Sequence, residues 1–314
     1  MRNLKELKVV FMGTPDFSVP CLAKLQENCQ VLAVITQPDR PRGRGQKMLP
    51  SPVKAFAVAH DLPVLQPEKI KTAEVEAALT ALQPDVIVVV AFGQILSQYI
   101  LDIPRLGCIN VHASLLPRYR GAAPLHWSII NGEKKTGVTT MFMDAGLDTG
   151  DMILKAEVPI SAEMTTAELH DELMVAGADL LLETLQALAD GTAERQKQDD
   201  AASNYAPLLK KTTGRIDWTK SAGQIHNLVR GLNSWPGAYS VLGGQNFKIW
   251  RTAVSREICP AKPGEVVKIS SCGFLIGTGD GLLEILEIQA PSKKKMSAKD
   301  YIIGHGLPVH TQFE

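Results

Sequence analysis

Residues 107–124 read GCINVHASLLPRYRGAAP, a short apolar run that leads directly into a loop containing proline and glycine. The apolar run predicts a buried strand, and the proline and glycine residues predict an irregular segment at its carboxyl end. Asn110 and His112 lie two positions apart, so both side chains project from one face of the strand. Such a pair is either hydrogen-bonded within a core or part of a site. We favour a site, because ligands of open α/β sheets bind at the carboxyl ends of strands.

The N-terminal part of the chain alternates between strand and helix patterns. Residues 8–12 and 31–36 are apolar β-rich runs, separated by helical spacing at residues 19–27. Residues 85–91 read DVIVVVA, which is typical of a central strand buried on both faces of a parallel sheet. We therefore expect an α/β fold with a doubly wound, Rossmann-like parallel sheet. The turn after the first strand holds the single glycine Gly13, and a dinucleotide fingerprint needs three, which argues against a dehydrogenase.

The C-terminal part predicts a second, smaller domain. A chain of 314 residues is long for one domain, and residues 192–214 are polar and lack a hydrophobic period. Short glycine-bounded apolar runs follow, such as residues 243–250 and 281–288, and regularly spaced short strands are typical of a small β-barrel. We predict a catalytic domain of residues 1–190, a linker of residues 191–213 and a C-terminal domain of residues 214–314.

Composition places few limits on the partners of this chain. The 33 Lys and Arg residues balance 33 Asp and Glu residues, so a nucleic-acid surface would have to come from local segregation of charge. The five cysteines are scattered without a Cys-x-x-Cys pair, and the N-terminus does not read as a signal peptide. We expect reduced thiols in a cytoplasmic protein with no membrane-spanning element.

Residues 37–52 form a basic segment interleaved with proline and glycine. Its cations are Arg40, Arg42, Arg44 and Lys47. One interpretation is a solvated surface loop, which is the usual fate of a charged run. The segment is long for a compact domain, and alternating Arg and Gly allow guanidinium groups and backbone to approach a phosphate chain. We therefore favour a nucleic-acid contact.

Lysines further along the chain have the same two interpretations. Lys210 and Lys211 lie in the predicted linker, and residues 293–295 form a lysine run between two predicted strands. Each group is either solvated or, together with Lys248 and Arg251, part of one positive face that grips nucleic acid without reading its sequence.

The motif Asn-x-His-x-Ser-Leu-Leu-Pro at residues 110–117, with Leu-Asp-Thr-Gly-Asp at residues 147–151, resembles the family of formyltransferases that use 10-formyltetrahydrofolate. The longer string at residues 112–124 and the basic segment are similar to those of the methionyl-tRNA formyltransferases within that family. The resemblance covers essentially the whole chain. It implies formyl transfer from 10-formyltetrahydrofolate, without a metal, to the α-amino group of methionyl-initiator tRNA. It also implies that the C-terminal domain is an OB-like barrel that holds the tRNA, and we expect a monomer.

The family's functional residues are carried over onto matching positions of this sequence. The catalytic positions are Asn110, His112 and Asp148. The folate-binding positions are Ser114, Leu115, Leu116, Pro117, Phe92, Ile95, Met141 and Asp144. The tRNA-binding positions are Arg40, Arg42, Arg44, Lys47, Lys210, Lys211, Lys293, Lys294 and Lys295.

These residue types suit transfer of a formyl group between two nitrogens. The tetrahedral intermediate needs a donor to its oxyanion, and one such donor, here the Asn110 amide, is worth roughly 10²–10³ in rate. Imidazole moves protons in either direction near neutral pH, which suits His112, and a neighbouring Asp148 would favour the imidazolium or shuttle the proton. An α-amino group is partly neutral near pH 7, so no covalent enzyme intermediate is needed and Ser114 positions the loop or the substrate.

Several alternatives remain open at this point. A metal site built from His112, Asp144, Asp148 and Asp151 has poor ligand spacing, and Asp144 and Asp151 suit turn capping better. A formyltransferase that acts on an amino sugar nucleotide, or a 10-formyltetrahydrofolate hydrolase domain, would use the same catalytic residues but not the basic segment. A nucleic-acid-binding module with a relic α/β domain has no reason to keep the three catalytic residues together.

Overall fold

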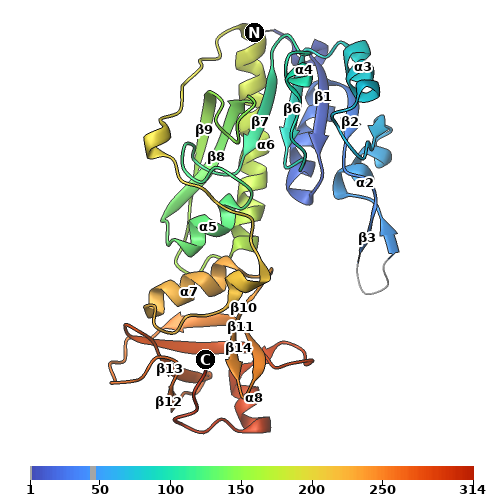
Figure 1. The fold of residues 1–314 in the computed structure, drawn as a ribbon. Helices are drawn as coiled ribbons and strands as arrows, with labels where there is room; N and C mark the ends of the chain where they lie inside the picture. The colour runs from blue at the N-terminus through green and yellow to red at the C-terminus, as the bar shows by residue number, and fades with distance from the viewer. Residues whose placement is uncertain (1, 43–46) are drawn as a thin grey trace. The chain divides into compact units, whose positions relative to one another are not determined.

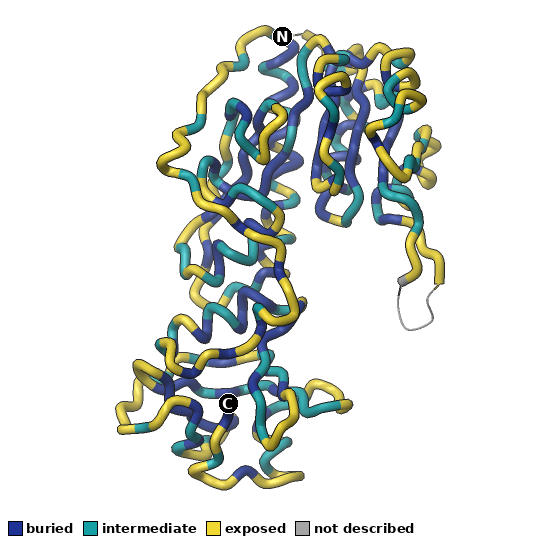
Figure 2. The backbone as a smooth tube through the Cα atoms, in the orientation of Figure 1, coloured by how far each residue is buried: buried dark blue, intermediate teal, exposed yellow. Residues whose placement is uncertain are grey.

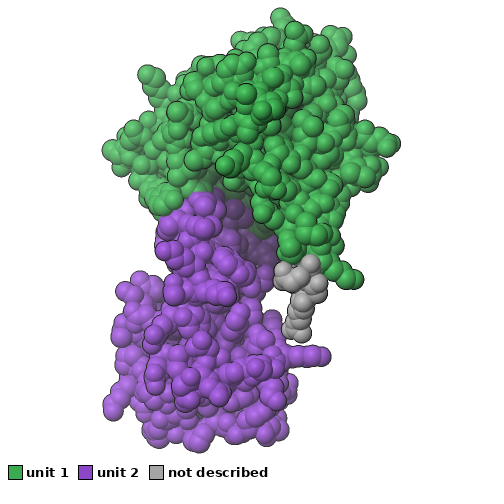
Figure 3. Space-filling model, turned by 45° about the vertical axis from the view of Figure 1, so that its right-hand side comes forward, with its two compact units in different colours: residues 1–121, 136–159, 170–205 green, residues 122–135, 160–169, 206–314 purple. Residues whose placement is uncertain are grey.

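The computed structural model describes residues 2–42 and 47–314, except for the side chain of Arg42. The chain divides into two compact units (Figure 3). The first unit comprises residues 1–121, 136–159 and 170–205, and the second comprises residues 122–135, 160–169 and 206–314. No helix in the described part of the chain is long and apolar enough to cross a membrane.

A seven-stranded sheet forms the centre of the first unit (Figure 1). Its order is β5-β2-β1-β6-β7-β8-β9. The strands are β1 (Lys8–Gly13), β2 (Gln30–Ile35), β5 (Val64–Leu65), β6 (Val86–Val90), β7 (Cys108–His112), β8 (Lys135–Phe142) and β9 (Met152–Pro159). The expected central strand is β6, which is buried at every position, as Figure 2 shows for the sheet interior. The predicted α/β, Rossmann-like fold is confirmed in its broad form.

The sheet is mixed, so the prediction of a parallel sheet holds for the first five strands of the sheet order and is wrong for β8. β5, β2, β1, β6 and β7 are parallel neighbours, whereas β8 runs antiparallel to β7 and places Met141 opposite Asn110. A parallel neighbour needs a crossover that carries the chain back along the sheet. The only α-helix between β7 and β8 in the described residues, α5 (Pro124–Ile130), belongs to the second unit. The chain therefore re-enters the sheet at the same end at which β7 leaves it, and β8 runs antiparallel to β7.

Helices cover the sheet of the first unit. They are α1 (Val19–Asn28), α2 (Pro52–Ala59), α3 (Ala73–Leu82), α4 (Gln98–Leu101) and α6 (Thr166–Asp190), with short 3-10 turns at Leu4–Glu6 and Asp16–Ser18. The predicted capping box begins α6, since Thr165 N donates to Glu168 Oε2 at 2.8 Å and Glu168 N donates to Thr165 Oγ1 at 3.4 Å. Gly177 lets α6 pack closely on the sheet, because an added Cβ would lie 3.2 Å from Val111 and 3.5 Å from Val138.

The basic segment forms a hairpin instead of the irregular loop that we expected. β3 (Arg40–Arg42) and β4 (Lys47–Leu49) pair antiparallel and extend away from the sheet in Figure 1. Pro41 is compatible with this pairing, because in a two-stranded ribbon its missing N–H can face solvent. Residues 43–46, including Arg44, lie outside the described part of the chain.

The second unit is built on an antiparallel sheet of order β10-β11-β14-β13-β12, with β15 paired to β14. Its elements are β10 (Ala238–Leu242), β11 (Gln245–Val254), β12 (Val266–Ile269), β13 (Phe274–Gly277), β14 (Leu282–Gln289), β15 (Met296–Ser297), α5, α7 (Ala222–Gly231) and α8 (Ala298–His305), with a 3-10 turn at Lys211–Gly214. A further 3-10 turn, Asp200–Ala202, belongs to the first unit. The rings of Phe274 and Phe313 stack in its core with centroids 5.8 Å apart. The expected short strands are thus present, and closure into an OB-like barrel stays a prediction.

Candidate active site

Asn110 and His112 lie on β7, a strand held between β6 and β8. His112 is the last residue of the strand and only 6% exposed, whereas Asn110 is half-buried. The described residues provide no hydrogen bond to the Asn110 amide. The predicted placement at the carboxyl end of a strand next to the central strand of the sheet therefore holds, and the Asn110 amide is available to a ligand.

The two ring nitrogens of His112 face different oxygens. Nε2 lies 2.9 Å from the Tyr119 carbonyl oxygen, and Nδ1 lies 3.7 Å from Asp148 Oδ2. A carbonyl oxygen only accepts hydrogen bonds, so this contact places a proton on Nε2. In the neutral ring, Nδ1 is then the nitrogen that can accept a proton beside a carboxylate. The structure thus brings His112 and Asp148 together, as the sequence predicted.

Asp148 is held in an unusual backbone conformation by the loop at residues 144–151. Its φ is +54°, in the left-handed region that few residues other than glycine adopt, and its Oδ2 accepts a 2.8 Å hydrogen bond from Gly121 N. Gly150 makes the loop possible, because a Cβ there would lie 1.8 Å from the Phe142 carbonyl oxygen. Asp144 closes the turn by accepting hydrogen bonds from Gly146 N and Thr149 Oγ1, as expected of a turn-capping residue.

Residues 191–205 form a strap that is hydrogen-bonded to this loop, and the sequence analysis did not predict these contacts. Gln198 Nε2 donates to both the Asp148 and Gly150 carbonyl oxygens at 2.8 Å. Arg120 in turn donates from Nε to Gln198 Oε1 at 3.0 Å and from a terminal nitrogen to Asp200 at 2.8 Å. These contacts join residues up to 80 positions apart. The segment that contains Gln198 and Asp200 is polar and has no hydrophobic periodicity, so its sequence does not predict these contacts. Of the three residues, only Arg120 lies within the motif at residues 107–124.

The residues predicted to bind folate differ in how much surface they offer. Leu116, Met141 and Phe92 are buried in core clusters, so they offer little surface to a ligand. Ile95 is 69% exposed and Asp144 is also exposed, whereas Leu115 and Pro117 are half-buried. Ser114 is buried, and its Oγ donates to the Arg118 carbonyl oxygen at 2.6 Å. That bond fixes the loop after β7, consistent with a positioning role.

Cysteine chemistry does not contribute to this edge of the sheet. Cys108 begins β7 four residues before His112, and burial, reinforced by the nearby Asp102 carboxylate, raises its pKa to about 12. A thiol with that pKa stays protonated at neutral pH and is a poor nucleophile. Within residues 2–42 and 47–314 the structure forms no group of three or more His, Cys, Asp or Glu side chains arranged to hold a metal ion.

The predicted tRNA-binding residues lie on both units. On the first unit, Arg40 is exposed and lies 3.7 Å from Glu68, and Lys47 is exposed. The side chain of Arg42 and the whole of Arg44 are outside the description. On the second unit, Lys295 Nζ pairs with Glu287 at 2.5 Å. The remaining members are exposed: Lys210, Lys211, Lys293 and Lys294.

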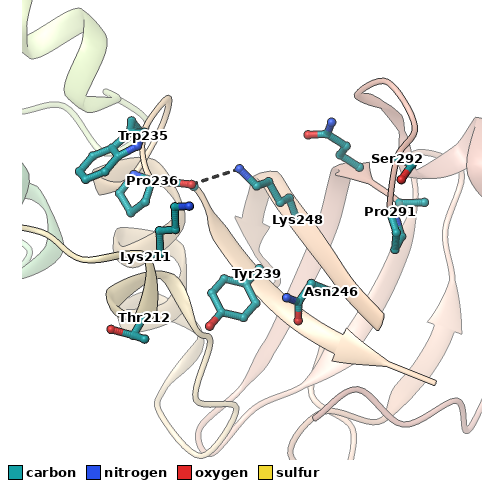
Figure 4. Close-up of a pocket in the computed structure, with 12 residues that line it drawn as sticks. Lys211, Thr212, Trp235, Pro236, Tyr239, Asn246, Lys248, Pro291 and Ser292 are labelled. Atoms are coloured by element: carbon teal, nitrogen blue, oxygen red, sulfur yellow. Dashed lines mark hydrogen bonds between the residues drawn. The ribbon is translucent and has the colours of Figure 1, made fainter. Parts of the chain in front are cut away.

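Two of the basic residues share one pocket on the second unit (Figure 4). Lys211 and Lys248 line a hollow of about 440 Å³ together with aromatic and amide side chains. The loop that ends at Ser292, directly before the lysine run, forms another part of its rim. The sequence named these lysines but could not show that they lie together.

Comparison with known proteins identifies the family. The profile described as "Formyl transferase" matches residues 7–185, and the profile described as "Formyl transferase, C-terminal domain" matches residues 208–306. The chain belongs to the formyl transferase family. It is 52% identical over 307 residues to the methionyl-tRNA formyltransferase of Ruminiclostridium cellulolyticum, covering 96% of this chain and 97% of the relative. It is 53% identical over 299 residues to that of Geobacter metallireducens, covering 95% and 96%.

Solved structures show the same fold at lower identity. The N-formyltransferase of Helicobacter canadensis, in complex with folinic acid and dTDP-3-aminofucose, has a TM-score of 0.67 at 22% identity and covers 90% of this chain and 99% of its own. HypX of Aquifex aeolicus in complex with tetrahydrofolic acid has a TM-score of 0.60 at 18% identity. This chain matches 94% of its own length but only 46% of HypX. At these identities the comparison establishes the fold alone.

Proposed function

We propose that this protein transfers the formyl group of 10-formyltetrahydrofolate to the α-amino group of methionyl-initiator tRNA. The product is N-formylmethionyl-tRNA for translation initiation. The observation that carries the proposal is the 52–53% identity to methionyl-tRNA formyltransferases, which extends over both units of the chain. The geometry around His112 supports the same chemistry.

Asn110 stabilises the charge that develops during transfer. When the α-amino nitrogen adds to the formyl carbon, the formyl oxygen becomes an oxyanion. The Asn110 amide N–H, which has no protein acceptor among the described residues, donates to that oxygen. A single donor of this kind is worth roughly 10²–10³ in rate.

His112 moves the proton that the reaction must transfer. Nδ1 accepts a proton from the amine as the new carbon–nitrogen bond forms. The same proton then passes to N10 of the folate as the bond from the formyl carbon to N10 breaks, which releases tetrahydrofolate. Between these steps the imidazolium is stabilised by the Asp148 carboxylate at 3.7 Å. The bond from Nε2 to the Tyr119 carbonyl keeps the ring in the required orientation.

The remaining residues divide between the two substrates. We assign folate binding to the surface beside Ile95, Leu115 and Pro117, supported from behind by the buried Leu116, Met141 and Phe92. The exposed cations of the β3–β4 hairpin, Arg40 and Lys47, are proposed to contact the acceptor end of the tRNA. Residues 214–314 are proposed to act as an OB-like tRNA-binding domain, with residues 1–190 as the catalytic domain and residues 191–213 as the linker.

An acceptor comparison tests this function. The parent protein is incubated with 10-formyltetrahydrofolate labelled in the formyl group and with methionyl-initiator tRNA, an amino sugar nucleotide, or water alone. Label on the tRNA, with little on the sugar nucleotide and little free formate, is expected. Label on the sugar nucleotide alone would assign the chain a different acceptor. Formate released at the same rate without any amine would make it a hydrolase.

A further inference from the structure

The pocket on the second unit has the volume of a small-molecule site. Its floor is formed by β10 and β11, one wall by residues 235–237 and the other by residues 289–292 (Figure 4). Its volume of about 440 Å³ falls within the ~300–1,000 Å³ of small-molecule sites. A single nucleotide therefore fits this space.

Aromatic surface is left exposed at this pocket. Trp235 is 54% exposed, and Tyr239 lies half-buried in the lining of the same pocket. The other two tryptophans of the β-sheet region are fixed by hydrogen bonds from their indole N–H, Trp218 to Ser240 Oγ and Trp250 to Gln289 Oε1. An exposed indole face is a stacking platform that accepts any base, because every base has a π face.

Two cations point into the same hollow. Lys248 Nζ donates to the Pro236 carbonyl oxygen at 3.2 Å and lies 5.1 Å from the centre of the Trp250 ring, so its position is fixed. Lys211 points toward it from the neighbouring segment in Figure 4. None of the described residues that line the pocket is acidic, although the whole chain has a net charge of zero. This local excess of positive charge favours a phosphate.

The backbone next to Lys248 has a conformation that requires glycine. Gly237 has a φ of +81°, and a Cβ there would lie 3.1 Å from the Trp250 ring and 3.4 Å from Lys248 Nζ. Glycine is therefore needed for the chain to turn closely around both side chains. The turn also presents the Pro236 carbonyl to Lys248, which leaves the other two hydrogens of the ammonium group available to a ligand.

We propose that this pocket binds one unpaired nucleotide of the tRNA, with its base on Trp235 and Tyr239 and its phosphates at Lys211 and Lys248. This assignment rests on the function proposed above. Bases inside a double helix are already stacked and cannot reach an indole, whereas bases in loops, bulges and ends can be splayed out. The pocket therefore adds a single-nucleotide contact in the second unit to the catalytic contacts of the first.

Substitution of Trp235 tests the stacking contact. Trp235→Ala should raise the Kd for methionyl-initiator tRNA about tenfold, because base–aromatic stacking contributes on this scale. The Kd of Trp235→Phe should stay within about threefold of the parental Kd, because phenylalanine keeps a π face for stacking. Ile303→Ala removes a more exposed apolar side chain, 75% exposed, from α8 outside the pocket, and should leave the Kd unchanged.

Substitution of the lysines tests the phosphate contact. Lys211→Gln and Lys248→Gln should each weaken binding and reduce the slope of log Kd against log salt by roughly 0.7–1, the value for one lost phosphate contact. Trp235→Ala should leave that slope unchanged. Lys299→Gln removes the same charge from α8, and an equal change of slope there would overturn the local assignment. Unchanged thermal melting curves establish that each variant is folded.

Three outcomes overturn the proposal and are distinguishable from one another. If the parent formylates the tRNA but Trp235→Ala binds it with parental affinity, the nucleotide site is wrong and the function stands. If the parent neither binds nor formylates methionyl-initiator tRNA, the function fails and the assignment fails with it. If the parent binds AMP, GMP, CMP or UMP saturably at micromolar concentration without tRNA, and Trp235→Ala does not, the pocket serves a free nucleotide.

Discussion

The catalytic edge of the first unit and the pocket of the second unit are built in contrasting ways. His112 is 6% exposed, with an oxygen facing each of its nitrogens, and the loop around Asp148 is fixed by several hydrogen bonds. Trp235 is 54% exposed, and the lysine beside it, Lys211, is exposed as well. Proton transfer requires fixed distances, whereas a grip on a polyanion requires accessible charge and aromatic surface. Substitutions in the two regions should therefore affect different kinetic parameters.

The largest effect is expected at His112. His112→Ala should lower kcat by roughly 10³, because the substitution removes the group that moves the proton, and such groups contribute ~10²–10⁴. The KM for tRNA should stay the same, since the side chain is buried at the edge of the sheet. His60→Ala is the matched control, because His60 is exposed at the end of α2. A parental kcat for His112→Ala would remove His112 from the mechanism.

Asn110 should come next. Asn110→Asp keeps the shape of the side chain but replaces the N–H donor with a carboxylate, so kcat should fall by at least ~10²–10³, the worth of one oxyanion donor. Single-turnover rates at saturating substrate measure this effect directly. If Asn110→Asp instead raised only the KM for folate, Asn110 would bind the ground state and would not stabilise the oxyanion.

Gln198 should have a moderate effect that acts through Asp148. Gln198→Ala removes two 2.8 Å hydrogen bonds to the loop carbonyls, each worth about 1 kcal/mol, and should lower kcat about tenfold. A double variant with Asp148→Ala should be no slower than Asp148→Ala alone, because the strap matters only through that carboxylate. Additive losses in the double variant would contradict this positioning role. Lys197→Ala, at the exposed neighbouring position, is the control.

The smallest expected effect is a difference between the two units in how fast their cysteine thiols react. Burial, with a smaller contribution from Asp179 at Cys21, raises the pKa of Cys21 and Cys29 in the first unit to about 12 and about 11. Burial also raises the pKa of Cys108 to about 12. Cys259 and Cys272, both in the second unit, are exposed. The three buried thiols stay protonated at pH 8, so a thiol reagent should titrate two cysteines quickly and all five only after unfolding. Fast reaction of a third thiol would contradict the described core.

Local patterns predicted local features. The apolar run before His112 became β7, and Thr165 with Glu168 formed the expected capping box. Two side chains two positions apart on a strand must share a face, so Asn110 and His112 could be paired from the sequence. Asp148 was added through a family motif and not through any period of the sequence.

Features that depend on distant contacts could not be read in the same way. The direction of β8 depends on the path of the chain between β7 and β8. The residues of β8 do not indicate that path. Gln198 reaches Asp148 across 50 positions of sequence, so its role is visible only in the folded chain. The pocket likewise combines Trp235, Lys248 and Lys211 from separate segments. The sequence analysis identified the lysines as positive charges. Their position in one pocket follows only from the fold of the second unit.

The most direct test of the account is single-turnover formylation of methionyl-initiator tRNA, with enzyme in excess over a range of concentrations. We predict that His112→Ala lowers the limiting rate without changing the half-saturating enzyme concentration. Trp235→Ala should raise the half-saturating concentration and leave the limiting rate unchanged. If both variants lowered the limiting rate alike, chemistry and tRNA binding would not be divided between the two units, and the account would be wrong.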